Sequence, residues 1–116
     1  MFKGLSAFFE NYSITVADSK NESLRPVDVA CGVESALVRV SKLLTELGYE
    51  SILENRDFSE IFAKNDNFEV TVSFIALPNS GCRIGVAVFS PGGKRSKKAL
   101  IGLMAEISKA FTNERI

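Results

Sequence analysis

The sequence has 116 residues, with 14 basic and 14 acidic side chains, no histidine, and 46% hydrophobic residues. This length suits one domain with a single core, and the balanced charge excludes a global electrostatic attraction to nucleic acid or to an anionic membrane. The missing histidines remove the usual general base near neutral pH, so we expect no enzyme and assign no catalytic residue, metal site or cofactor.

An apolar stripe recurs at spacings of three and four near the N-terminus, at Phe2, Leu5, Phe8, Phe9 and Tyr12. The spacing predicts a short helix, which is marginal in water unless it docks on the domain core, on a second copy or on a membrane surface. A β-prone run follows at residues 13–17, and a polar loop leads from it to Pro26. We therefore treat residues 1–25 as a docking segment.

A long helix is predicted over residues 27–47. Pro26 and Asp28 suit the start of a helix, and apolar residues then recur at a helical period. Gly48 is placed to end the helix as a C-terminal cap. So long an apolar stripe needs a broad apolar sheet beneath it.

Four strands are predicted next, over residues 49–54, 58–64, 68–77 and 82–90. The last two alternate apolar and polar positions, and the linker at residues 78–81 has the composition of a hairpin turn. A short linker with turn-forming residues favours antiparallel pairing of the two strands that it joins, and four strands joined in this way form a meander.

A final amphipathic helix is predicted over residues 96–111. The predicted fold is therefore one α+β domain over residues 1–116, with its core in residues 26–112. It has a four-stranded antiparallel sheet with both long helices packed on one face, and a short N-terminal helix and strand are added to it.

The outer face of the sheet is expected to carry an apolar patch. Ile75, Leu77 and Phe89 point away from the face that holds Phe74 and Val88, if the strands alternate regularly. With the N-terminal stripe, these residues form the predicted interface. The alternative is that the N-terminal segment folds over them.

A basic glycine turn precedes the final helix and offers a candidate anion site, composed of Ser90, Gly92, Gly93, Lys94, Arg95, Lys97 and Lys98. Cations at the positive end of a helix dipole are disfavoured, and an anionic partner would offset this cost. The turn is not a nucleotide-binding loop of the Walker type, because Val88 stands where that motif has its first glycine and Arg95 replaces its Ser or Thr. The alternative is a solvated surface turn.

Two cysteines, Cys31 and Cys82, lack the spacing of a zinc site and are expected to be buried free thiols of a reducing compartment. The acidic residues of the predicted hairpins lack supporting ligands, so they predict no metal site. With no run of apolar residues long enough for a membrane span and no secretory signal, we expect a cytoplasmic protein.

A resemblance is carried by residues 46–50 (ELGYE), residues 70–72 (VTV) and residues 82–89 (CRIGVAVF). Over residues 27–107 the sequence resembles a small bacterial domain family of unknown function, often carried by lipoproteins. The resemblance implies the order helix, four strands, helix, and it implies no catalytic residue. The lipid-attached cysteine and signal peptide of such lipoproteins are not seen in this sequence.

The expected function is a non-enzymatic protein-interaction or accessory domain that forms homo-oligomers. The alternative function is anion or nucleic-acid binding through the basic glycine turn. Peripheral membrane contact through the N-terminal segment also remains open, whereas an integral membrane protein is not expected.

Overall fold

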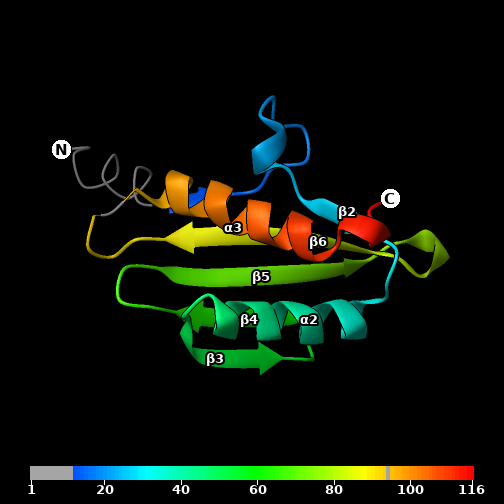
Figure 1. Cartoon of the computed structure of the whole chain (residues 1–116), viewed down its shortest axis with the longest axis horizontal. Coiled ribbons are helices and arrows are strands. Elements are labelled where there is room, and N and C mark those ends of the chain that lie inside the picture. Colours follow the sequence, from blue (N-terminus) through cyan, green and yellow to red (C-terminus); the bar gives the residue numbers. More distant parts are fainter. Residues whose placement is uncertain (1–11, 94) are drawn as a thin grey trace.

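The computed structural model describes residues 12–93 and 95–116. Within them, six strands form one antiparallel sheet in which β1, β6, β5, β4 and β3 follow one another, and β2 also pairs with β6 (Figure 1). The strands are β1 (Tyr12–Ile14), β2 (Val27–Val29), β3 (Glu50–Asn55), β4 (Glu60–Lys64), β5 (Glu69–Ala76) and β6 (Cys82–Phe89). The predicted antiparallel α+β class is confirmed.

Two helices, α2 (Val33–Glu46) and α3 (Ser96–Ala110), cover the same face of this sheet (Figure 1). Helix α2 lies over β3, β4 and β5, while α3 lies over β6, β1 and β2. The other face has no helix on it among the described residues. We call it the open face.

The sheet has six strands, where the sequence predicted a four-stranded sheet and one added N-terminal strand. β3 to β6 form the predicted meander, and β1 and β2 are two short strands that pair with different parts of β6. Most of the predicted N-terminal helical stripe lies outside the described residues. Its last member, Tyr12, was wrongly placed in a helix, because Tyr12–Ile14 pair with β6 as strand β1.

The predicted start of the first helix is wrong. Residues 27–29 form β2, and α2 begins only at Val33, after the N-cap residue Gly32. Val27 pairs with Ile84 in β6, and Val29 pairs with Cys82. Val29 matches the period of the following helix by chance, but burial of both β-branched side chains against β6 determines their conformation.

The core lies between the sheet and the helices. Every second residue of the central strands points into it and is buried, as are the inward residues of both helices. The buried strand residues include Ile61, Ala63, Val70, Val72, Phe74, Ile84, Val86 and Val88. The helices contribute Leu37, Val40, Leu44, Leu100, Leu103 and Ile107.

Glycines mark two of the close turns. Gly48 has φ +90° directly after α2, and the amide of Tyr49 returns to the carbonyl of Leu44, so the predicted cap is confirmed. Gly81 is the last residue of the turn between β5 and β6. A Cβ added at Gly81 would lie 2.8 Å from the carbonyl oxygen of Val29. The hairpin therefore packs tightly on β2.

The C-terminal residues are tied to β2 and α2. The amide of Ile116 donates to the carbonyl of Asp28, and residue Arg115 bridges to Val29. Arg39 of α2 donates to Glu114 at 2.6 Å and stacks over the ring of Phe111. The segment after α3 is thus held beside the helix-covered face.

The outer strand β3 is irregular. Its register with β4 shifts between Glu50 and Leu53, and Ser51 has φ +53°. A bulge of this kind bends the strand and interrupts the regular row of backbone groups at the sheet edge.

Candidate functional site

The open face of the sheet carries large apolar side chains at outward positions of four strands. The exposed fractions are 52% for Ile14, 62% for Leu53, 38% for Phe62 and 60% for Ile75. Antiparallel sheets with one solvated face usually place polar residues there. This face is therefore a candidate interaction surface.

Strand register brings five of the outward residues into one row across the sheet. Leu53 is opposite Phe62, Phe62 is opposite Thr71, and Thr71 is opposite Ala87. Ile14 of β1 ends the row opposite Ala87. Residues from opposite ends of the sequence thus form one nearly continuous apolar strip.

A pocket of about 190 Å³ opens on this face between β1 and β2. Ile14 and Ile75 form its apolar walls, and Gly85 leaves space in its floor because it has no side chain. Beside it, Arg83 donates to both carboxylate oxygens of Asp28, at 2.7 and 3.0 Å. This hydrogen bonding lowers the pKa of Asp28 and raises that of Arg83.

The predicted interface residues are only partly brought together. Ile75 lies on the open face, and Phe89 lies on it half-buried, in register with Tyr12 of β1. Leu77 lies beyond the last residue of β5, in the hairpin turn. Phe2, Leu5, Phe8 and Phe9 lie outside the described residues.

The sequence did not identify three of the open-face residues, Ile14, Leu53 and Phe62, as part of the predicted interface. The signal for Phe62 was present, because it lies between two inward positions, Ile61 and Ala63, of a predicted strand. Leu53 could not be oriented from the sequence because the register shift in β3 breaks its alternation.

The basic glycine turn does not form an enclosed site from its described side chains. Arg95, Lys97 and Lys98 are exposed, and Lys94 lies outside the described residues. Ser96 is buried and its hydroxyl lies 2.9 Å from that of Ser13, which docks the start of α3 on β1. Anion binding at this turn stays a prediction.

Ser90 and the two glycines of this turn differ in their surroundings. Ser90 is fully buried, and its hydroxyl has no hydrogen-bond partner among the described residues, whereas Gly92 and Gly93 are exposed. Gly93 has φ +84°, a conformation that glycine adopts without strain. The buried hydroxyl of Ser90 is out of reach of a ligand in the solvent.

Side chains that could hold a metal ion are not clustered within residues 12–93 and 95–116. No three acidic or cysteine side chains among them converge as metal ligands. Cys82 is buried, and burial raises the pKa of its thiol to about 11, so the group stays protonated near neutral pH. Cys31 is half-buried, and neither cysteine forms a disulfide.

No helix within the described part of the chain is long and apolar enough to cross a membrane. No known family model matches the chain, and no curated protein matches it.

Proposed function

We propose that the protein is a non-enzymatic interaction domain that self-associates by stacking the open faces of two copies. The observation that carries this proposal is the exposure of Ile14, Leu53, Phe62 and Ile75 on one sheet face. Contact with a second copy would remove these side chains from water. The two copies would then form four layers, with the helices outside and the two sheets inside.

The size of the open face supports a contact between two copies. The strands range from three residues in β1 and β2 to eight in β5 and β6, so at about 3.3 Å per residue and about 4.8 Å per strand the face covers roughly 500 Å². Stable specific interfaces bury about 600 to 1,000 Å² on each partner, so the face is just below that range, where weak and transient contacts are found. We therefore expect reversible association that depends on protein concentration.

The experiment measures mass in solution by sedimentation velocity over a range of protein concentrations. The full chain should reach the mass of a dimer, and Ile75→Glu should stay monomeric because the stacked contact would have to remove a carboxylate from water, which costs free energy even beside its cross-strand neighbour Arg83. Val38→Glu is the matched control. Val38 is 49% exposed, but it lies on α2, outside the sheet, so this variant should still dimerise.

A chain shortened to residues 12–116 tests whether the open face is covered by a second copy or by the N-terminal segment of the same chain. It should dimerise as the full chain does. If only the shortened chain dimerises, the N-terminal segment occupies the open face and the proposal is wrong. A monomeric full chain at all concentrations, or equal losses in Ile75→Glu and Val38→Glu, would also contradict it.

A further inference from the structure

A second cavity lies on the helix-covered side of the sheet, away from the open face. It has a volume of about 460 Å³ and lies between the short helix η1 (Glu22–Leu24) and the second half of α3. Pockets for small molecules commonly measure about 300 to 1,000 Å³. Because a stacked second copy would not reach it, its role is independent of self-association.

Part of the cavity lining is apolar. Val27 of β2 and Met104 of α3 are each only 3% exposed, and Ile101 and Ala105 extend this lining along α3. Methionine adapts its shape to irregular partners. These side chains form a surface suited to an aliphatic chain.

The rim carries two arginines from opposite ends of the sequence, Arg25 and Arg115. Apart from an attraction to Asp28, the Arg115 side chain has no hydrogen bond or ion pair with another described residue. Its backbone is fixed by the bridge to Val29. A guanidinium thus lies beside the cavity, and the described residues offer it only the longer-range attraction of Asp28.

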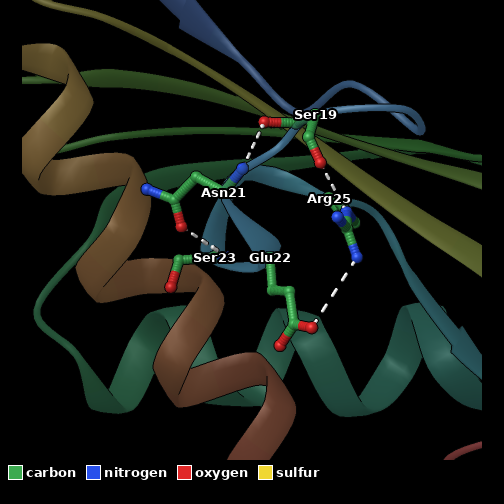
Figure 2. Close-up of polar contacts among 5 residues, drawn as sticks. All are labelled: Ser19, Asn21, Glu22, Ser23 and Arg25. Carbon is green, nitrogen blue, oxygen red and sulfur yellow. Dashed lines mark hydrogen bonds and ion pairs between the residues drawn. The ribbon is translucent and has the colours of Figure 1, made fainter.

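Arg25 is held by the turn that contains it (Figure 2). Its Nε donates to the carbonyl of Ser19 at 2.6 Å, while the carboxylate of Glu22 lies 3.8 Å from one of its terminal nitrogens. The side chain of Asn21 accepts from the amide of Ser23 at 3.0 Å and caps the helix η1. The loose pair with the highly exposed Glu22 leaves Arg25 able to bind another anion.

We propose that this cavity binds a small monocarboxylate with an aliphatic tail. Arginine forms paired hydrogen bonds with a planar carboxylate, so Arg25 and Arg115 would hold the head group. The tail would lie along Ile101 and Ala105, which are more exposed, above the nearly buried Val27 and Met104. Two arginines and Glu22 give the rim a net charge of +1, which one carboxylate neutralises and a doubly charged phosphate exceeds.

Octanoate is the probe, and its binding to the full chain is measured by isothermal titration calorimetry. Acetate has the same charge without the tail, and 1-octanol has the same tail without the charge. Because the site uses both parts, octanoate should bind at least about tenfold more tightly than either comparison compound. Equal binding of octanoate and 1-octanol, or no binding of octanoate at millimolar concentration, would overturn the proposal.

Two matched variants locate the site. Arg115→Gln should weaken octanoate binding about tenfold, because it removes a charged partner of the carboxylate. Arg95→Gln makes the same change in the basic glycine turn at the other end of α3, and should leave binding unchanged. Circular dichroism checks that both variants are folded. If Arg95→Gln weakens binding and Arg115→Gln does not, the anion binds at the basic turn and the proposal is wrong.

Discussion

The helix-covered face and the open face of the sheet are formed by alternate residues of the same strands. On the covered face, Val72 and Ile84 are fully buried beneath the helices, whereas on the open face Ile75 and Leu53 are about three-fifths exposed. Both faces contain large aliphatic residues, so composition alone does not distinguish them. The difference shows that apolar residues of one strand are buried in the core on one side and left exposed on the other, where we propose that they serve association.

The largest expected effect comes from shortening a leucine on the covered side. Leu100 of α3 is fully buried, so Leu100→Ala should lower the free energy of unfolding by about 2–5 kcal/mol. The same change on the open face, Leu53→Ala, should cost less than about 0.5 kcal/mol in dilute protein. Urea unfolding measures both values.

If Leu53→Ala lowers the free energy of unfolding of the monomer as much as Leu100→Ala does, the predicted difference between the two faces is wrong. Another part of the chain would then cover the open face. At higher protein concentration the cost of Leu53→Ala should increase, because dimerisation adds to the stability of the folded state.

A medium effect is expected where the hairpin packs on β2. Gly81→Ala places a Cβ 2.8 Å from the carbonyl oxygen of Val29, and a backbone atom cannot move away easily. We expect a loss of about 1–3 kcal/mol in the free energy of unfolding. Gly92→Ala is the control at the other end of β6, since its Cβ would meet no atom within 4 Å. Equal unfolding midpoints for the two variants would contradict this prediction.

The smallest effect concerns the ion pair on the open face. Asp28→Asn removes a partly exposed pair with Arg83 and should cost less than about 1 kcal/mol at neutral pH. The pKa of Asp28 is lowered in the folded protein, chiefly by its hydrogen bond with Arg83, so its stabilisation is present above the ordinary value of 3.8. That stabilisation is lost as the pH falls through the lower folded value.

Urea unfolding of wild type and Asp28→Asn at a series of pH values measures this dependence. The difference between the two proteins should shrink as the solution becomes acidic, and Arg83→Gln should remove the same pH dependence. A difference that grows towards low pH would have the wrong sign for a lowered pKa.

The sequence predicted the elements whose pattern is local. The alternation of Val70, Val72 and Phe74 identified the core face of β5, and the position of Gly48 identified the end of α2. β2 was missed because Val29 fits the period of the following helix and Pro26 suits the start of a helix. Only their pairing with β6, more than fifty residues later, places them in a strand.

The binding surfaces were harder to predict because they depend on tertiary contacts. Ile75 was identified by alternation within one strand. Nothing local in the sequence indicates that Arg25 and Arg115, ninety positions apart, line one cavity, since the pairing of the C-terminal residues with β2 brings them together.

The irregular strand β3 has a consequence for how many copies can join. An added strand would need a straight row of backbone donors and acceptors, and the positive φ of Ser51 interrupts that row on the outer edge. Lengthening of the sheet from molecule to molecule is therefore disfavoured at this edge. Stacking of open faces uses the whole surface in a single contact, so assembly should stop at closed pairs and not continue into fibres.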